Sequence, residues 1–497
     1  MAMPAAVGRL WRVCRTRRRV LTAIAAILAA AAPMFSASAD TPLFESCRLR
    51  GIDDAARCAM FTLPETPQGT ATVRIHVAIV PALTRNPEPD PVYVLAGGPG
   101  QAASDIGGLV EALSALRRRR DIVLVDQRGT GRSKTLTCKS DGNDTGTMDP
   151  VSAAFVAPEG SERRAWARCL ETMKGNVAAH RTDDYIDDLE AISSALNHKR
   201  INLWGGSYGS RVALRYMKRF PARIRSAVLD GVAPTSMHLP DDALGASAAR
   251  LDALFTACAA SPGCAKAYPN AAKAFDTTLS RLRQQPLRVS LLHPASGTRI
   301  TGTLSDRRLL MLTWPLLYKA ESSRLLPALL DAAARGDAAP LLSTVAASSV
   351  TEGDIAVPMR FAVMCAEDML DRKPPTHTPF ASIAELFYGF CTDLPHGRVA
   401  AEFFEPTVSA IPTLLLSGRV DPVTPPRYAE LAAKTLTNHR LLTVANAGHI
   451  VSTLPCVRRI ITRFVESAEV GAARHDCERN LQLPPPLFYV SPLVAAP

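Results

Sequence analysis

The segment INLWGGSYGSRVAL, residues 201–214, contains a serine flanked by glycines in the pattern Gly-x-Ser-x-Gly, from Gly205 to Gly209. Residues 201–204 form a short β-rich run, and the residues after the pattern are typical of a helix. Strand, sharp turn and helix in this order present a nucleophilic serine at the C-terminal edge of a sheet. We therefore predict that Ser207 is a catalytic nucleophile, the alternative being a glycine-rich turn without a catalytic role.

A serine nucleophile needs a general base and an acid that orients the base. After a turn of this kind they follow along the chain in the order Ser, Asp or Glu, His. The run 441–444 is predicted to be a strand and leads into a glycine-containing loop with His449. The run 413–416 is a predicted strand and leads to Asp421. We predict that His449 is the base and Asp421 its partner, although an aspartate before a proline can also be a simple turn residue.

Such an enzyme also needs backbone N–H groups that stabilise an oxyanion. One is expected from the residue after the nucleophile, Tyr208, and one from an earlier loop after a strand. The run 91–96 leads into the glycine-rich turn Gly97-Gly98-Pro99-Gly100. We predict that Gly98 and Tyr208 form the oxyanion hole.

Strand and helix patterns alternate along most of the 497 residues, which predicts a doubly wound, mostly parallel α/β sheet. Residues 236–405 interrupt the alternation and are mostly helical, so we expect a cap inserted between two parts of one sheet. The predicted organisation is a signal peptide over 1–39, the first part of the core over 40–235, the cap over 236–405, and the second part of the core with a proline-rich tail over 406–497. The remaining predicted strands are 72–81, 92–96, 122–125 and 227–229, and the predicted helices are 107–120, 183–197, 207–220, 241–260, 325–335, 426–436 and 456–467.

The N-terminus has the three parts of a secretory signal. An arginine-rich start precedes an apolar run over 20–35, and Ala37-Ser38-Ala39 forms a small-residue cleavage site. The apolar run is shorter than the ~20 residues of a spanning helix, an uncleaved anchor being the alternative. We expect export to the periplasm or the medium by the Sec or the twin-arginine route, without stable membrane insertion after cleavage.

Removal of the signal peptide changes the charge of the chain. Six arginines and no acids leave, so the formal charge falls from +11 to +5. The one dense basic run that remains, Arg117 to Arg120, is predicted to be the solvated end of a helix. We therefore do not expect nucleic acid as a partner.

The cysteines indicate disulfides. Eleven occur, and ten remain once Cys14 leaves with the signal peptide. An even number in an exported protein favours a disulfide framework, and the spacing typical of a zinc site is missing. Many connectivities are possible, and we favour pairing of neighbours along the chain. These pairs are Cys47–Cys58, Cys138–Cys169, Cys258–Cys264, Cys365–Cys391 and Cys456–Cys477.

Three motifs in order resemble the proline iminopeptidase branch of the α/β-hydrolases. They are Gly97-Gly98-Pro99-Gly100, the run DQRGTGRS from Asp126 to Ser133, and the Gly-x-Ser-x-Gly pattern. The run SGRVDPVTP over 417–425 and Gly448-His449 resemble the secreted tripeptidyl aminopeptidase group within that branch. The resemblance extends over about residues 43–477. It implies the α/β-hydrolase fold and a serine exopeptidase acting at free peptide N-termini. Ala96 departs from the histidine usual in proline iminopeptidases, so proline specificity is not carried over.

The resemblance also implies carboxylates in the cap that bind the ammonium group of the substrate. Glu367 is the first candidate and Asp368 the second, because they follow Cys365, which could be tethered to Cys391. Exposed helix acids are the alternative, since surface carboxylates are the norm. Within the DQRGTGRS run we predict that Asp126 and Arg128 form a structural ion pair.

Taken together, the sequence predicts an exported, monomeric serine aminopeptidase that acts on short peptides or small acyl substrates through an acyl-enzyme. Neither a metal nor an organic cofactor is expected. The alternatives are a secreted esterase or lactonase with the same triad, and a catalytically idle binding protein on the same fold.

Overall fold

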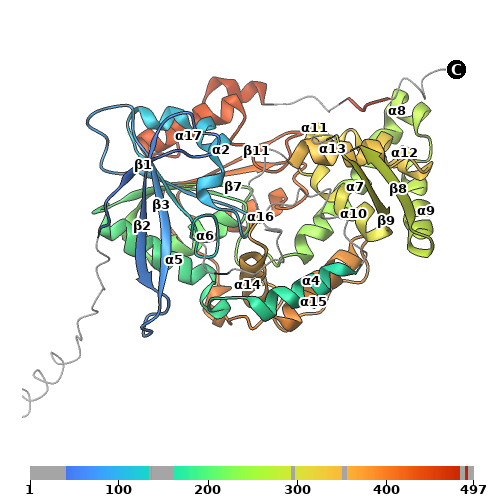
Figure 1. The fold of residues 1–497 in the computed structure, drawn as a ribbon. Coiled ribbons are helices and arrows are strands. Elements are labelled where there is room, and N and C mark those ends of the chain that lie inside the picture. Colours follow the sequence, from blue (N-terminus) through green and yellow to red (C-terminus); the bar gives the residue numbers. More distant parts are fainter. Residues whose placement is uncertain are drawn as a thin grey trace, which may run out of the picture. The chain divides into compact units, whose positions relative to one another are not determined.

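The computed structural model describes residues 41–133, 136, 160–292, 297–349, 355–481 and 487–490. The predicted signal peptide lies outside these residues. Nine of the described strands form one sheet in the order β1-β2-β3-β5-β4-β6-β7-β10-β11 (Figure 1). They are β1 (Glu45–Cys47), β2 (Ala56–Pro64), β3 (Thr72–Val80), β4 (Val92–Leu95), β5 (Ile122–Val125), β6 (Ile201–Gly206), β7 (Ile224–Asp230), β10 (Thr413–Gly418) and β11 (His439–Val444).

The sheet is mostly parallel, as the sequence predicts. Strands β5, β4, β6, β7, β10 and β11 pair in parallel, whereas β1, β2 and β3 form an antiparallel meander that joins β5. Every residue of β4 and β5 is buried, which is typical of parallel strands covered on both faces. Strands β1 and β2 were missed by the prediction, and the other seven strands of the sheet lie where it places them.

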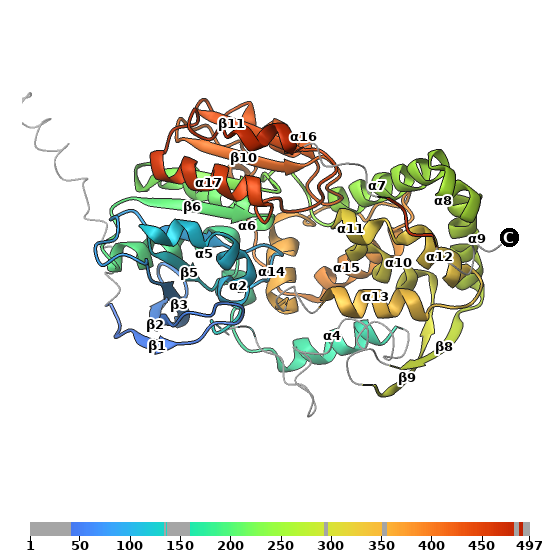
Figure 2. The same ribbon diagram turned by 90° about the horizontal axis from the view of Figure 1, so that it is seen from above.

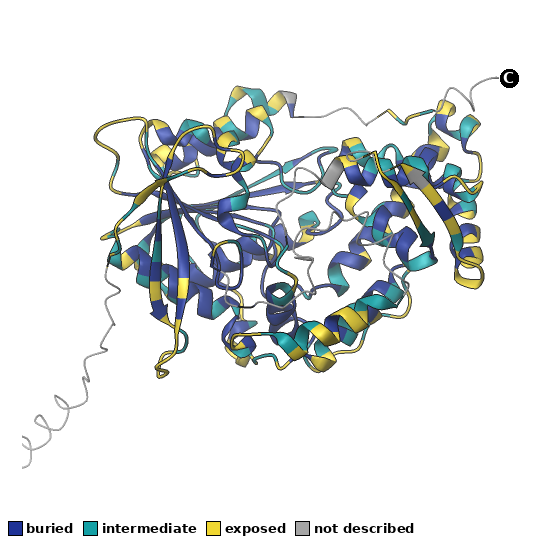
Figure 3. Ribbon diagram, viewed as in Figure 1, coloured by how far each residue is buried: buried dark blue, intermediate teal, exposed yellow. Residues whose placement is uncertain are grey.

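Alternate side chains of the central strands enter two apolar clusters. Tyr93 and Leu95 belong to one cluster, and Val92 and Val94 belong to the other. Because successive side chains of a strand point to opposite faces, the two clusters mark the two faces of the sheet. The central strands are drawn in the colour of buried residues in Figure 3. Helices α5 (Thr182–Ala195), α6 (Tyr208–Arg219) and α16 (Pro426–Ala433) contribute to the first cluster, and α2 (Gly107–Ala112) and α17 (Pro455–Ser467) to the second.

The chain between β7 and β10 has an apolar cluster of its own, which includes Leu254, Leu309 and Phe380. It is mostly helical, but it also contains the antiparallel hairpin β8 (Leu287–Leu292) and β9 (Arg299–Leu304), which the prediction lacks (Figure 2). The domain boundaries near 235 and 405 stay predictions. The helices of this interval are α7 (Asp241–Ala260), α8 (Pro262–Ala267), α9 (Ala271–Gln284), α10 (Asp306–Leu316), α11 (Ala320–Ser323), α12 (Leu326–Ala334), α13 (Ala339–Ser349), α14 (Val357–Glu367) and α15 (Ala381–Asp393).

Helix α4 (Ser161–Thr172) precedes β6 in the chain but packs against this interval. The indole of Trp166 donates a hydrogen bond to the carbonyl of Phe390 in α15, at 3.0 Å. The same indole stacks near the rings of Phe361 and Phe390. A further apolar cluster, which includes Trp166, Phe361 and Phe390, is therefore built from two separate parts of the sequence.

The predicted helix over 107–120 is wrong in its second half. Helix α2 ends at Ala112, and a 3₁₀ turn, η2 (Ser114–Arg118), follows. Arg117 and Arg120 are buried and pair with Asp54 and Asp90, at 2.8 and 2.9 Å. The prediction of a solvated helix end fails for these two arginines because each has a carboxylate partner. The further 3₁₀ turns are η1 (Ala103–Asp105), η4 (Val177–Ala179), η5 (Pro221–Arg223), η6 (Ala401–Phe403) and η7 (Asp476–Asn480).

Four predicted disulfides are confirmed. They are Cys47–Cys58, Cys258–Cys264, Cys365–Cys391 and Cys456–Cys477. Cys169 is also disulfide-bonded, and its predicted partner Cys138 lies outside the described residues. Within the ranges that the structure describes, no helix combines the length and apolar character needed to cross a bilayer.

Candidate active site

Ser207 lies in the sharp turn between β6 and α6. Its backbone has φ 55° and ψ −124°, in a region that costs a residue other than glycine about 1–3 kcal/mol. The amide of Ser207 donates to the carbonyl of Asp230 at 2.8 Å, and the hydroxyl of Ser210 donates to the carbonyl of Ser207. These bonds hold the strained turn, which presents the serine at the C-terminal edge of the sheet.

The flanking glycines allow the turn because the backbones approach closely there. A Cβ atom at Gly205 would lie 2.4 Å from the carbonyl oxygen of Gly209. A Cβ atom at Gly209 would lie 2.1 Å from the carbonyl oxygen of Leu95, in β4. The Gly-x-Ser-x-Gly pattern is therefore required by the contact of α6 with β6 and β4.

Asp421 follows β10 and meets the imidazole of His449. Asp421 Oδ2 lies 2.8 Å from His449 Nδ1. The carboxylate also accepts hydrogen bonds from the amides of Val423 and Thr424, at 2.8 and 2.9 Å, and from the Thr424 hydroxyl, at 2.8 Å. Burial alone would raise the pKa of Asp421, but the charge of His449 and these hydrogen bonds outweigh burial and hold that pKa below its usual value.

The cap and the core together fix His449. Its amide donates to the carbonyl of Tyr318 at 2.7 Å, and the Tyr318 ring packs edge-on against the imidazole at 5.5 Å. A Cβ atom at Gly231, directly after β7, would lie 2.9 Å from His449 Cε1. A larger residue at position 231 would therefore displace the imidazole.

Ser207 and His449 line one cavity of about 520 Å³. The structure thus brings the predicted nucleophile and base to one site, with Asp421 bonded behind His449. The charged residues of the described lining are Asp105, Lys319 and Arg360. Apolar lining residues from the cap include Leu239, Ala243, Trp314, Met364 and Phe387.

Both predicted oxyanion residues lie at this cavity or next to it. Gly98 lines the cavity and has φ 110°, which favours glycine. Its neighbour Gly97 lies against the nucleophile, since a Cβ atom there would be 3.1 Å from Ser207 Cβ. Tyr208 is the first residue of α6, so its N–H has no acceptor within the helix.

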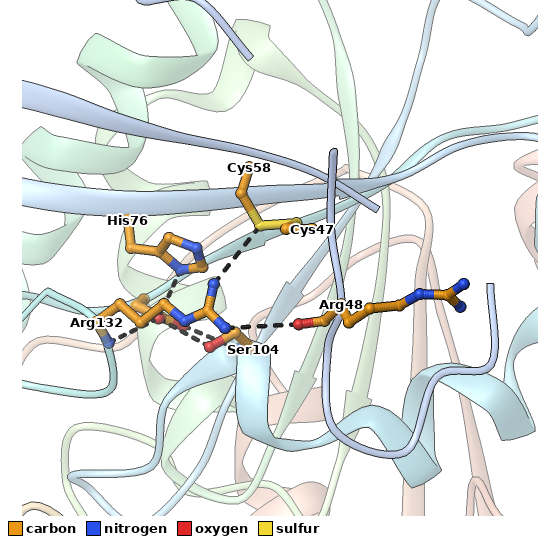
Figure 4. Close-up of a disulfide and its surroundings, with 7 residues drawn as sticks. Cys47, Arg48, Cys58, His76, Ser104 and Arg132 are labelled. Carbon is orange, nitrogen blue, oxygen red and sulfur yellow. Dashed lines mark hydrogen bonds and ion pairs between the residues drawn. A yellow bond between two sulfur atoms is a disulfide. The ribbon is translucent and has the colours of Figure 1, made fainter. Parts of the chain in front are cut away.

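A buried carboxylate braces the segment that follows the Gly97–Gly100 turn. Asp126 accepts hydrogen bonds from the amide and the hydroxyl of Ser104, at 2.8 and 2.9 Å. It also bonds to His76 Nδ1, at 2.9 Å, and to the amide of Arg132, at 3.2 Å. Figure 4 shows His76, Ser104 and Arg132 beside the Cys47–Cys58 disulfide, with the Arg132 side chain near Cys58.

The predicted ion pair between Asp126 and Arg128 is wrong. Arg128 instead forms a two-pronged pair with Asp188 of α5, at 2.7 and 2.8 Å. Both side chains are buried, and Asp126 already accepts from Ser104, His76 and Arg132. Asp126 and Arg128 lie two residues apart after β5, and each bonds to different residues.

Glu367 and Asp368 lie outside the described lining of the cavity. They are 2% and 1% exposed and share the guanidinium of Arg211, whose Nη1 lies 2.9 Å from Asp368 and 3.5 Å from Glu367. Glu367 also accepts hydrogen bonds from the amide and hydroxyl of Thr182, at 2.6 and 2.9 Å. This placement argues against the predicted contact with a substrate ammonium group, because the acids are enclosed and Arg211 already supplies a cation.

The surroundings of these two acids disfavour their charged forms. Burial raises the pKa of Glu367 to about 7 and that of Asp368 to about 6, although Arg211 acts in the opposite direction. Two carboxylates near one guanidinium cannot both ionise without leaving a net negative charge in the interior.

The residues that support the site from behind are not predicted from the sequence. Helix α6 contains two buried arginines, Arg211 and Arg215. Arg211 lies one turn after Ser207, and a charge at that position is the signal that could have revealed the cluster. Thr182 and Asp105 carry no such signal, because their roles depend on which elements meet in space.

Comparisons with known proteins place the chain in a family. A family described as alpha/beta hydrolase fold matches residues 90–453. The serine protease Hip1 of Mycobacterium tuberculosis (strain ATCC 25618 / H37Rv) is 34% identical over 144 residues, which cover 27% of this chain and 28% of that protein. The proline iminopeptidase of Xylella fastidiosa (strain 9a5c) is 29% identical over 152 residues, 30% of this chain and 34% of that protein.

Both matches therefore span less than two thirds of the relatives' own length. Among solved structures, proline iminopeptidase from Mycobacterium smegmatis aligns with 83% of this chain and 100% of that chain, at 16% identity and a TM-score of 0.37.

Proposed function

Because this chain belongs to the alpha/beta hydrolase fold family, we propose that it is a serine hydrolase with Ser207, His449 and Asp421 as its catalytic triad. The observation that carries the proposal is the bonded Asp421–His449 pair at the cavity that Ser207 lines. Acyl transfer needs a nucleophile and a general base that is oriented by an acid. The strained serine at the start of a helix and the histidine bonded to a buried carboxylate are suited to these roles.

In the proposed reaction, Ser207 Oγ attacks the carbonyl carbon of the substrate and His449 Nε2 accepts the proton. Asp421 accepts a hydrogen bond from His449 Nδ1–H, which selects the tautomer with a basic Nε2 and stabilises the imidazolium. The N–H groups of Gly98 and Tyr208 stabilise the oxyanion. His449 then protonates the leaving group, and water releases the acyl group from Ser207 by the same steps.

Within this class we propose an aminopeptidase that acts on short peptides. The similarity to a serine protease and to proline iminopeptidases supports a peptide substrate. An aminopeptidase needs an anion for the α-ammonium group, and Asp105 is the single carboxylate among the described lining residues. We therefore assign the ammonium contact to Asp105, next to the Gly97–Gly100 turn, in place of Glu367 and Asp368.

We also propose that the chain is exported. Four disulfides within the described residues are consistent with an oxidising compartment, where such bonds persist. The arginine-rich start and the Ala37-Ser38-Ala39 sequence supply a signal peptide. Mass spectrometry of the N-terminus of the exported protein should find Asp40 first, whereas an intact N-terminus in the mature protein would contradict cleavage.

Matched peptide amides with free and acetylated N-termini test the enzymatic proposal. The wild type should cleave the free peptides and discriminate strongly against the acetylated ones, and Ser207→Ala should cleave neither. Equal rates on both members of each pair would reject the aminopeptidase. Cleavage of small esters with no cleavage of any peptide would indicate an esterase that uses the same triad.

A further inference from the structure

Helix α14 of the cap begins at the oxyanion turn. The amide of Ala356, just before the helix, donates to the carbonyl of Gly100 at 2.9 Å, and Ile355 forms a β-bridge with Gln101. Arg360, in the first turn of α14, donates from Nε to the carbonyl of Pro99 at 3.3 Å. The backbone on the C-terminal side of Gly98 is thus held by α14.

The other end of α14 reaches the second predicted oxyanion residue. Glu367, the last residue of the helix, accepts from the amide and the hydroxyl of Thr182, at 2.6 and 2.9 Å. The Thr182 hydroxyl lies 2.7 Å from the hydroxyl of Tyr208, which also accepts a hydrogen bond from Gln127 Nε2 at 3.1 Å. A chain of hydrogen bonds therefore links Glu367 to the side chain of the residue that follows the nucleophile.

All residues of this hydrogen-bond series are buried, so water cannot replace a lost partner. Thr182 and Tyr208 are at most 1% exposed, and Glu367 is 2% exposed. Arg211, on the same helix as Tyr208, is fully buried and donates to both acids and to the carbonyl of Met237. Breaking one bond in such a network costs the full desolvation of the group left unsatisfied.

We propose that α14 positions both sides of the oxyanion hole, and that Glu367, through Thr182 and the Tyr208 hydroxyl, is a positioning residue for the Tyr208 N–H. The proposal rests on the proposed serine hydrolase mechanism. The peptide between Ser207 and Tyr208 carries the strained backbone of the nucleophile, and such strain persists only where the surroundings over-determine it. Anchoring the far end of the Tyr208 side chain restrains the rotation of that peptide.

Three substitutions each remove one link of the hydrogen-bond series between Glu367 and Tyr208. Tyr208→Phe removes the hydroxyl, and Thr182→Val removes the link at nearly constant shape. Glu367→Gln leaves one acceptor oxygen for three donors, which are the amide and hydroxyl of Thr182 and Arg211 Nη1. Asp368→Asn is the matched control. Asp368 is bonded to the same Arg211, but its carboxylate has no bond to Thr182 or Tyr208.

The measurements are kcat and KM for a short p-nitrophenyl ester, and the rate at which a fluorophosphonate labels Ser207. Each of the three substitutions should lower kcat and the labelling rate about tenfold. Complete loss of an oxyanion donor lowers kcat about 10²–10³-fold, and a displaced donor lowers it less. KM should change less than twofold. Thr182→Val combined with Tyr208→Phe should be no slower than either alone, and Asp368→Asn should retain kcat within twofold.

Unchanged kcat in Tyr208→Phe and Thr182→Val would overturn the proposal, as would an effect confined to KM. An equal loss of kcat in Asp368→Asn would also overturn it, because the effect would then come from packing around Arg211. The ester makes the result independent of peptide specificity. A wild type that neither hydrolyses the ester nor reacts with the fluorophosphonate would contradict both the serine hydrolase proposal and the proposal for α14. An active wild type with fully active variants would contradict only the proposal for α14.

Discussion

Two groups of buried carboxylates lie behind the candidate site, and they are held in different ways. Asp421 is a single acid with three hydrogen-bond donors from its own loop and one histidine, and its pKa lies below the usual value. Glu367 and Asp368 are two acids around one arginine, and their pKa values are raised to about 7 and about 6. Burial raises the pKa of all three carboxyl groups, so the difference comes from their partners. Asp421 has a histidine and three donors to itself, whereas Glu367 and Asp368 share one cation, and the charge of Asp368 raises the pKa of Glu367 further.

The comparison separates two uses of a buried acid. Asp421 is stabilised as an anion and bonds to a histidine at the cavity, which suits a group that must balance a positive charge as it forms. Glu367 and Asp368 are enclosed and engage groups that do not change charge, namely Thr182 and Arg211. They are placed to hold elements together. Each of the following predictions tests this separation.

The largest difference is expected in turnover. Asp421→Asn should lower kcat about 10⁴-fold, since the neutral amide no longer selects the required tautomer of His449. Asp368→Asn changes a carboxylate of the other group in the same way and should leave kcat within twofold. Kinetics on the same ester or peptide amide measure both, and a similar loss in the two variants would contradict the separation.

The second largest effect concerns stability. Arg211→Met should lower the free energy of unfolding by about 3–5 kcal/mol, because it leaves two buried acids without their cation. Chemical denaturation with the disulfides intact gives the value. Arg419→Met, at an exposed arginine beside the catalytic loop, is the control and should change stability by less than about 0.5 kcal/mol. Equal stability of the two variants would show that the Arg211 cluster contributes nothing to the fold.

A fourth carboxylate, Asp105, lines the cavity and should affect one class of substrate only. Asp105→Asn should lower kcat/KM about tenfold for peptides with a free N-terminus, the loss expected for about 1.4 kcal/mol of binding. Acetylated peptides should be unaffected. Glu111→Gln, an exposed acid in α2, should behave as wild type.

Retained discrimination in Asp105→Asn would assign the ammonium contact elsewhere. Asp354→Asn serves as a second comparison, since Asp354 is next in sequence to the cavity-lining Ile355 but lies outside the described residues. Loss of discrimination in Asp354→Asn alone would overturn the assignment to Asp105.

The smallest effect is the pH dependence of stability. The folded-state pKa of Glu367 is raised to about 7, above its value in an unfolded chain, so the folded protein binds more protons between those two values. The free energy of unfolding contributed by Glu367 therefore falls as pH rises from about 5 to about 7. Asp421 has the opposite sign, because its lowered pKa adds stability at neutral pH that is lost in acid.

Denaturant midpoints at pH 5 and pH 8 measure the effect of Glu367, and midpoints at strongly acidic pH and at pH 5 measure that of Asp421. Glu367→Gln should gain stability relative to wild type as the pH rises, while Asp421→Asn should lose stability relative to wild type as the pH rises from strongly acidic values. Parallel pH profiles of Glu367→Gln and wild type would contradict the raised pKa.

The sequence allowed prediction of the parts that depend on local pattern. The order of strand, Gly-x-Ser-x-Gly and helix predicts the turn at Ser207, and the strands before Asp421 and His449 place both residues at the same sheet edge. The disulfides followed from neighbour pairing, and four of the predicted pairs are present. Each of these features depends on residues close in sequence or on the direction of parallel strands.

The remaining features depend on contacts between distant segments. Glu367 follows Cys365 in a motif-like run, but only the packing of α14 against α5 and α6 shows that Thr182 and Arg211 are its partners. Asp126 and Arg128 are close in sequence, yet their partners His76 and Asp188 lie on different elements. Charge and spacing identify residues as candidates, and tertiary contacts decide which charges meet.

Reaction of the mature protein with a fluorophosphonate, followed by mass spectrometry of its peptides, tests the central claim most directly. A folded wild type should carry one adduct, on Ser207, and His449→Ala should react at least 100-fold more slowly because the base is missing. Ser207→Ala should carry no adduct. Labelling of Ser207→Ala at the wild-type rate, or an adduct on a different residue, would contradict the assignment of Ser207 as the nucleophile.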